Sequence, residues 1–378
     1  MRQLFISLIL SLSFMPQLSQ AAAVAPPPSL AVKAYLLTDF NSGTIIATHK
    51  KDERVEPASL TKIMTAYVTF DAIQQGHLKL DQTLPVSEKA WKVEGSKMFI
   101  EPNKPVTVDE LLHGMIIQSG NDASITLAEG VAGSEEQFAQ MMNKQATKLG
   151  MTNTRYMNAT GLPDKAHFTT ASDLAILATA LIRDFPLEYR RLYSVKEYSY
   201  NKITQPNRNR LLWLDANVDG MKTGHTESAG YCLISSAKRG DTRMISVLLG
   251  AVSEAMRASE SQKLLNYGFQ FYESTKVYKQ NQTINTMRVF KGQDKIVSAT
   301  ISKDFYLTLP KGDYAKVKAN MISQQPLIAP IKAGQTIGKI SFTLNGKIIN
   351  EQKLVAAKSV DEAGFVGRII DSVKLMLQ

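Results

Sequence analysis

Three short polar clusters stand in a fixed order along this 378-residue chain, and a fold that uses them together must bring them to one place. The first, at 59–62, reads Ser-Leu-Thr-Lys; the second, at 119–121, reads Ser-Gly-Asn; the third, at 222–224, reads Lys-Thr-Gly. The first pairs a hydroxyl with an amine three residues later, and residues at that spacing share one face of a helix. The second adds a hydroxyl and an amide, and the third adds an ammonium, a hydroxyl and a glycine. Together they indicate one active site.

None of the three clusters is specific when taken singly. The Ser-x-x-Lys spacing recurs from Ser199 and from Ser235, and Ser-x-Asn also recurs from Ser199. The surroundings strengthen the ordered set. Apolar residues at helical spacing over 63–73 follow the first cluster, and strand-like runs at 231–234 and 244–249 follow the third. A hydroxyl at a helix start that faces a Lys-Thr-Gly strand is the context that such a site needs.

Ser59 has an ordinary and a catalytic interpretation. A serine at a helix start can cap a free backbone N–H, but a capping box has Glu or Gln three residues later, where this chain has Lys62. A cation in the first turn also opposes the helix dipole. The catalytic interpretation explains both residues, because partial burial beside a second cation, Lys222, would lower the pKa of Lys62 and make it a base. We therefore predict Ser59 as nucleophile and Lys62 as its base.

The other two clusters also have ordinary alternatives, a helix–helix turn for the second and a hairpin turn for the third. In the catalytic interpretation, Ser119 relays a proton between the amine of the first cluster and a leaving amine. Asn121 then hydrogen-bonds a substrate amide. Lys222 polarises the site, Thr223 binds a substrate carboxylate, and Gly224 leaves room for the acyl chain.

Cysteine and histidine are too few and too scattered to indicate a metal site. The five histidines form no His-Glu-x-x-His motif, and Cys232 is the only cysteine, so the chain can form no intramolecular disulfide. Cys232 lies in an apolar strand pattern, which predicts a buried structural role. We predict no metal and no cofactor.

The beginning of the chain is typical of an export signal. Arg2 precedes an apolar run over 4–15, and three alanines at 21–23 form a small-residue cleavage site. We predict a signal peptide over 1–23, with an uncleaved anchor as the alternative. The formal net charge is +10, but no block of lysine and arginine is interleaved with aromatic residues, so nucleic acid is not an expected partner. An anionic membrane surface or wall polymer fits this charge better.

The pattern divides the rest of the chain into three parts. Mixed strand and helix patterns over 30–273 predict an α/β domain, and short alternating segments over 274–360 predict a small all-β sandwich with a spacer role. Over 361–378 one helical face is apolar and the other polar, in a segment too short and too polar to span a bilayer. We predict an amphipathic membrane-anchoring helix there; packing on the β domain is the alternative. The expected strands of the β domain are 286–290, 296–301, 305–309, 315–322 and 337–344.

The three clusters resemble the ordered motifs of penicillin-binding proteins and class A β-lactamases. The fuller texts at 56–62 (Glu-Pro-Ala-Ser-Leu-Thr-Lys) and 118–123 (Gln-Ser-Gly-Asn-Asp-Ala), with the β domain and terminal helix, are similar to those of low-molecular-mass penicillin-binding proteins. These are the exported D-alanyl-D-alanine carboxypeptidases of bacterial cell walls. The resemblance implies an α/β penicillin-recognising (transpeptidase/β-lactamase-like) domain, with a five-stranded antiparallel sheet and a helical cluster. It also implies that the protein is exported and lies at the periplasmic face of the inner membrane.

The resemblance also implies a reaction. Such enzymes remove the terminal D-Ala from peptidoglycan stem peptides through an acyl-enzyme, which would form here on Ser59, and β-lactam antibiotics would acylate the same oxygen. The backbone N–H groups of Ser59 and His225 would hold the oxyanion. Arg257 lies where the family carries an arginine that helps to bind the terminal carboxylate. Two alternatives remain: a class A-like β-lactamase, although we find no Glu-x-x-Leu-Asn motif, and a wall-binding protein of weak activity.

Overall fold

A five-stranded antiparallel sheet organises the first domain of the protein, whose computed structural model describes residues 25–377. All four strand pairings in this sheet are antiparallel, and the sheet is the one that the resemblance implies. Its strands, in spatial order, are β2 (Ile45–His49), β1 (Ala34–Asp39), β9 (Thr242–Ala251), β8 (Gly230–Arg239) and β7 (Val218–Thr226). The predicted strands at 231–234 and 244–249 lie in β8 and β9. The predicted signal peptide over 1–23 lies outside the described residues.

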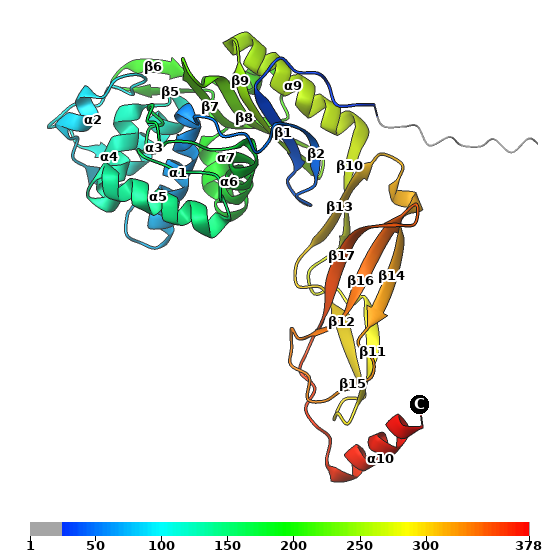
Figure 1. The fold of residues 1–378 in the computed structure, drawn as a ribbon. Coiled ribbons are helices and arrows are strands. Elements are labelled where there is room, and N and C mark those ends of the chain that lie inside the picture. Colours follow the sequence, from blue (N-terminus) through cyan, green and yellow to red (C-terminus); the bar gives the residue numbers. More distant parts are fainter. Residues whose placement is uncertain (1–24, 378) are drawn as a thin grey trace, which may run out of the picture.

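Both faces of the sheet are covered, because successive side chains of a strand point to opposite faces. Leu36 and Val247 pack with the helical cluster on one face, whereas Leu37 and Met244 pack with α9 (Glu254–Phe271) on the other. Cys232 is buried in β8, as predicted. The helices of the cluster are α1 (Lys62–Gln74), α3 (Val108–Ile117), α4 (Asn121–Ala132), α5 (Glu135–Leu149), α6 (Ala171–Asp184) and α7 (Pro186–Leu192). Figure 1 shows α9 on the face of the sheet away from them.

Helix α1 is the central helix of the cluster and confirms the helix predicted over 63–73. Every residue from 62 to 70 is buried, and a helix that is buried all round belongs in a core. The remaining short elements are the helices α2 (Glu88–Lys92) and α8 (Leu211–Leu214), the hairpin β3 (Thr83–Leu84) with β4 (Val106–Thr107), and the hairpin β5 (Glu197–Tyr200) with β6 (Ile203–Pro206).

The β domain follows α9 directly and extends away from the first domain (Figure 1). Its strands are β10 (Tyr272–Tyr278), β11 (Asn285–Phe290), β12 (Ile296–Thr300), β13 (Phe305–Pro310), β14 (Lys318–Ser323), β15 (Leu327–Ile328), β16 (Thr336–Leu344) and β17 (Lys347–Ala356). Strands β10 and β13 form a ribbon, and the other six form one sheet. The strand predicted to begin at 315 begins only at 318, because Tyr314–Lys316 forms a 3-10 turn that continues the preceding bend.

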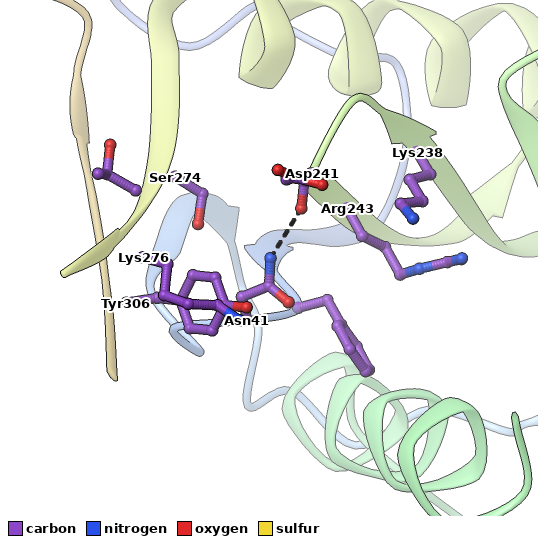
Figure 2. Close-up of a pocket in the computed structure, with 9 residues that line it drawn as sticks. Asn41, Lys238, Asp241, Arg243, Ser274, Lys276 and Tyr306 are labelled. Carbon is purple, nitrogen blue, oxygen red and sulfur yellow. Dashed lines mark hydrogen bonds between the residues drawn. The ribbon is translucent and has the colours of Figure 1, made fainter. Parts of the chain in front are cut away.

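The two domains meet through partly buried polar contacts near the end of β1. The Ser274 hydroxyl donates to Asp39 Oδ1 at 3.1 Å, and the Ser42 and Thr308 hydroxyls lie 2.7 Å apart. A cavity of about 560 Å³ lies at this junction. Figure 2 shows it, with the Asn41 side chain donating to the backbone carbonyl of Asp241 in the turn between β8 and β9. Hydrogen bonds therefore link the β domain to the edge of the first domain.

Helix α10 (Phe365–Met376) lies at the far end of the β domain (Figure 1). It contacts that domain through a polar residue: the Asp371 carboxylate accepts a hydrogen bond from the Lys291 backbone N–H at 2.7 Å and pairs with Lys295 at 3.2 Å. The alternative for this segment was that its apolar face packs on the β domain. Seven of its apolar side chains are exposed instead. The exposed residues are Phe365, Val366, Ile369, Ile370, Val373, Met376 and Leu377. No helix within 25–377 is long and apolar enough to cross a membrane.

One carboxylate fixes the loop beside the second polar cluster. Asp122, fully buried in the first turn of α4, accepts hydrogen bonds from the backbone N–H groups of Met98 (3.0 Å), Phe99 (2.9 Å) and Ile100 (3.3 Å). A buried N–H that loses its partner costs about 1–3 kcal/mol.

We predict that Asp122→Ala destabilises the first domain by about 3 kcal/mol, because these backbone N–H groups lose their acceptor. Such a loss corresponds to a fall in Tm of roughly 6–12 °C for a domain of this size. Asp122→Asn should lose less, since one side-chain oxygen remains an acceptor. Differential scanning calorimetry measures the change, and an unchanged Tm for Asp122→Ala would refute this role.

Candidate active site

Ser59 lies in a 3-10 turn, Ala58–Thr61, that runs directly into α1. Its hydroxyl caps no helix, so the ordinary interpretation is not what the structure has. The Ser59 Oγ lies 3.0 Å from Lys62 Nζ. Ala58, just before it, has a φ of 48°, in the left-handed region that costs a non-glycine residue about 1 kcal/mol or more. The turn therefore presents Ser59 at some conformational cost, as functional sites often do.

The Lys62 amine is buried among three oxygens. The residue is 1% exposed, and Nζ lies 2.7 Å from Asn121 Oδ1, 2.6 Å from the Thr160 carbonyl oxygen and 3.0 Å from Ser59 Oγ. A neutral amine has two N–H donors and one lone pair, whereas an ammonium has three donors and no lone pair. The two shorter contacts can use both N–H groups of the neutral amine. Its lone pair then faces the Ser59 hydroxyl.

Burial and, second, the positive charge of Arg208 lower the pKa of Lys62 to about 7, while Asp122 and Glu135 act in the opposite direction. We predicted that Lys222 supplies the second cation; the charges of Lys62 and Lys222 do act on each other, and Arg208 is a further cation that the sequence did not predict. This arginine stands in no motif, and only the fold brings it to the site. At neutral pH a large fraction of Lys62 can therefore act as a base.

Strand β7 carries the third cluster against the turn that holds Ser59. A Cβ on Gly224 would lie 3.1 Å from the Pro57 carbonyl oxygen and 3.3 Å from the Ala58 Cβ, so glycine permits this close approach. Lys222 is 3% exposed, and its pKa is lowered by burial and by the charges of Lys62, Arg208 and Arg257. Its Nζ donates to the Thr223 carbonyl oxygen at 3.2 Å. The hairpin-turn interpretation does not apply, because the cluster lies within a strand.

The second cluster forms the turn between α3 and α4 and also lies at the site. Ser119 has a φ of 64°, and its buried Oγ has no hydrogen-bond partner in the described part of the chain. The Asn121 side chain is already engaged, since Oδ1 faces Lys62 and Nδ2 donates to the Glu94 carbonyl oxygen at 2.6 Å. We predicted that this amide binds substrate, but the structure places it against Lys62.

A cleft of about 550 Å³ joins these elements. Six of the nine predicted site residues line it, and the other three, Lys62, Asn121 and Lys222, are buried. The lining residues are Ser59, Gly95, Ser96, Ser119, Arg208, Thr223, Gly224, His225, Tyr231, Glu254 and Arg257. No group of His, Cys, Asp or Glu suited to a metal ion is found within 25–377.

Two arginines, Arg208 and Arg257, lie close together in the cleft. The Arg257 guanidinium lies 5.6 Å from the centre of the Tyr231 ring, 3.4 Å from Glu254, and 3.4 Å from the Arg208 carbonyl oxygen. Burial lowers the pKa of Arg257 from its ordinary value. The negative charge of a substrate carboxylate would compensate the positive charges of Arg208 and Arg257 together. Arg257 was expected from the resemblance, whereas Arg208, Tyr231 and Glu254 were not predicted, because no local pattern marks them.

Comparison with known proteins gives one consistent result. A family profile described as D-alanyl-D-alanine carboxypeptidase matches residues 20–253, and one described as penicillin-binding protein 5, C-terminal domain, matches residues 272–362. The chain is 44% identical over 370 residues to the D-alanyl-D-alanine carboxypeptidase DacC of Escherichia coli K12, covering 96% of this chain and 92% of that protein.

Solved structures agree. Penicillin-binding protein 5 from Haemophilus influenzae superposes with a TM-score of 0.86 at 40% identity, covering 89% of this chain and all of that one. Penicillin-binding protein D2 from Listeria monocytogenes, solved in an ampicillin-bound form, superposes with a TM-score of 0.60 at 31% identity, covering 65% of this chain and all of that one. The chain belongs to the D-alanyl-D-alanine carboxypeptidase family of low-molecular-mass penicillin-binding proteins.

Proposed function

We propose that this protein is a serine D,D-carboxypeptidase that removes the terminal D-Ala from peptidoglycan stem peptides ending in D-Ala-D-Ala. The observation that carries the proposal is the 3.0 Å contact between Ser59 Oγ and a buried Lys62 amine whose pKa is lowered to about 7. The names of its relatives agree with this activity. No cofactor enters the reaction, since nucleophile and base are both side chains.

The reaction is an acyl transfer in two steps. Ser59 Oγ attacks the penultimate D-Ala carbonyl carbon as its proton passes to Lys62 Nζ. The backbone N–H groups of Ser59 and His225 hold the oxyanion; a donor of this kind typically contributes about 3 kcal/mol. The proton then passes from Lys62, through the Ser119 hydroxyl, to the nitrogen of the departing D-Ala. Water, deprotonated in turn by Lys62, attacks the ester carbon; the bond to Ser59 Oγ then breaks as Lys62 returns the proton to that oxygen, and the shortened peptide leaves.

The substrate's terminal carboxylate binds in the cationic part of the cleft. Thr223 offers a hydroxyl there, and Arg257 and Arg208 offer positive charge. Lys222, buried nearby, adds to the positive potential when it is protonated. Asn121 holds Lys62 through Oδ1, so its contribution to substrate binding goes through the position of the base.

β-Lactams are expected to acylate Ser59, since a relative of this fold was solved with ampicillin bound. A class A-like β-lactamase is the less favoured alternative, because the relatives are carboxypeptidases and a β domain follows the first domain. A wall-binding protein of weak activity also fits less well, because the nucleophile and its base are in contact.

We predict that Ser59→Ala abolishes both D-Ala release and covalent labelling by fluorescent penicillin, because the oxygen that forms the acyl-enzyme is gone. Ser194→Ala, a serine outside the cleft, is the control and should retain both activities. Labelling of Ser59→Ala at the wild-type rate would place the nucleophile elsewhere. Rapid turnover of penicillin by the wild type, instead of a lasting adduct, would favour the β-lactamase alternative.

The pKa of Lys62 sets a pH dependence with a definite sign. The amine is protonated below about pH 7 and neutral above it, and only the neutral form accepts the Ser59 proton. The rate constant for acylation by penicillin should therefore rise as pH increases through about 7, with a slope of about tenfold per pH unit on the acid side. Stopped-flow measurements from about pH 5 to about pH 9 test this. An acid limb centred near pH 10 would contradict it.

The exposed apolar face of α10 supports peripheral attachment to an anionic membrane. Seven apolar side chains, each half-buried in lipid, contribute several kcal/mol at about 25 cal/mol per Å². Arg368 and Lys374 add attraction to anionic headgroups of at most about 1 kcal/mol each. Together with the predicted export signal, this face supports our proposal that the enzyme works at the periplasmic face of the inner membrane. Nucleic acid is not a proposed partner.

We predict that deleting 361–378 abolishes co-sedimentation with anionic vesicles and leaves hydrolysis of a soluble peptide unchanged. The double change Ile369→Asp and Ile370→Asp should act like the deletion, because the apolar face carries the affinity. Ser372→Asp, on the polar side of the same helix, is the matched control and should bind. Undiminished sedimentation of the deletion variant would place the membrane contact elsewhere in the protein.

A further inference from the structure

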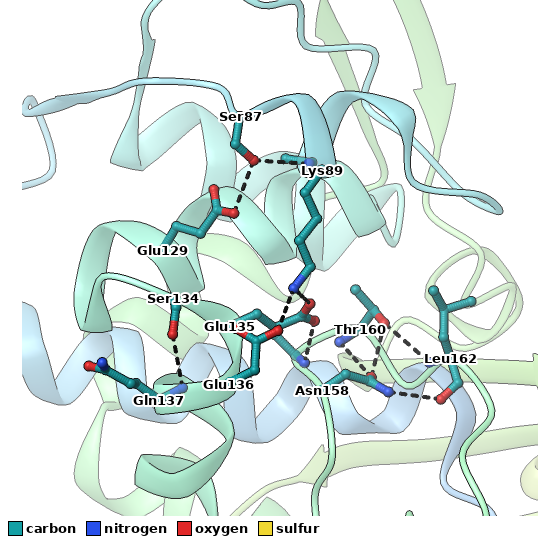
Figure 3. Close-up of polar contacts among 12 residues, drawn as sticks. Ser87, Lys89, Glu129, Ser134, Glu135, Glu136, Gln137, Asn158, Thr160 and Leu162 are labelled. Carbon is teal, nitrogen blue, oxygen red and sulfur yellow. Dashed lines mark hydrogen bonds and ion pairs between the residues drawn. The ribbon is translucent and has the colours of Figure 1, made fainter.

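A buried carboxylate near Lys62 has no part in the reaction described above. Glu135 begins α5 and is 7% exposed. Its Oε1 accepts a hydrogen bond from the Ala159 backbone N–H at 2.9 Å, and its Oε2 pairs with Lys89 Nζ at 3.0 Å (Figure 3). Ala159 directly precedes Thr160, whose carbonyl oxygen binds Lys62. The carboxylate is thus one residue away from the shell of oxygens around the base.

Two helices hold the backbone on the amino side of Thr160. Asn143, also on α5, accepts from the Tyr156 backbone N–H at 2.8 Å and donates to the Tyr156 carbonyl oxygen at 2.7 Å. The Thr65 hydroxyl of α1 donates to the Ala159 carbonyl oxygen at 2.7 Å. Glu135 binds the opposite, N–H side of the same residue. Its contact is therefore the one that fixes the Ala159 N–H, immediately before the carbonyl that Lys62 uses.

The following residues pack directly on the turn that holds the nucleophile. Asn158 Oδ1 accepts from the backbone N–H groups of Thr160 at 3.2 Å and of Gly161 at 2.7 Å, which closes a tight turn (Figure 3). Gly161 has a φ of +84°, and a Cβ there would lie 1.8 Å from the Ala58 carbonyl oxygen. A displacement of this turn would therefore move both Ser59 and the acceptor of Lys62.

We propose that Glu135 is a positioning residue for acylation: it holds the 158–161 turn so that the Thr160 carbonyl oxygen accepts from Lys62 and the free face of the amine meets Ser59. This inference rests on the proposed function, in which Lys62 is the base. Glu135 touches neither nucleophile nor base, and it acts through the backbone that it binds.

The same carboxylate also affects the charge of the base. Arg208 disfavours the ammonium form of Lys62, whereas Asp122 of α4 and Glu135 of α5 favour it. Lys222 on β7 is a further cation near the amine. Glu135 therefore limits how far the pKa of Lys62 falls, in addition to fixing its hydrogen-bond acceptor. Position and charge can be separated by substitution, because glutamine keeps an oxygen acceptor and removes the charge.

The test compares Glu135→Ala, Glu135→Gln and Glu136→Gln by acylation with fluorescent penicillin across pH. Glu136 is the matched control, since it also pairs with Lys89 but its side chain is 73% exposed. We expect Glu135→Ala to acylate about tenfold more slowly or worse, because small displacements in a site are costly. Glu135→Gln should recover most of the rate near neutral pH and shift the acid limb to lower pH. Glu136→Gln should match the wild type in both.

Thermal unfolding of each variant separates this role from a merely structural one. If both Glu135 variants, measured below their Tm, acylate at the wild-type rate with an unshifted acid limb, Glu135 serves the fold alone and the proposal is overturned. Failure of the wild type itself to acylate on Ser59 would overturn the proposed function as well. Acylation by the wild type with unaffected Glu135 variants would overturn only this inference.

Discussion

The site depends on one constraint, an amine that must lose its charge in order to act and is therefore kept out of water. Lys62 meets it because α1 is buried all round and its first residue lies beneath the turn of Ser59. Two oxygens, from Asn121 and Thr160, satisfy the N–H groups that burial would otherwise leave unpaired. The amine is surrounded by helix α4, the 158–161 turn and strand β7. The cleft is the open space in front of Ser59.

Much of this arrangement could be predicted from the sequence, because it depends on side chains that recur at fixed spacing along the chain. The hydroxyl and amine three residues apart, the apolar spacing over 63–73 and the runs that became β8 and β9 are local signals, and the structure has the elements they predict. The resemblance supplied the sheet as a whole. The amphipathic pattern over 361–378 was also local, and its apolar face is exposed in α10.

The rest could not be predicted, for physical reasons that differ from case to case. The Thr160 acceptor is a backbone carbonyl, which any residue carries, so no side chain marks it. Arg208 acts through space, and its loop has no distinguishing pattern. Asn121 was expected to face substrate, but its side-chain oxygen accepts a hydrogen bond from the buried amine of Lys62. Strand β17 was missed because few of its residues are buried, so its alternation is weak.

The central claim is that a large fraction of Lys62 is a neutral amine in the resting enzyme near neutral pH. Nuclear magnetic resonance of the protein with 15N-labelled lysine can follow the Nζ of this residue directly, with its resonance assigned by its absence in Lys62→Met. We expect a titration midpoint of about 7 for this buried amine. A midpoint at the ordinary value of about 10.4 would contradict the account, because the base would then be charged throughout the range in which it is required to work.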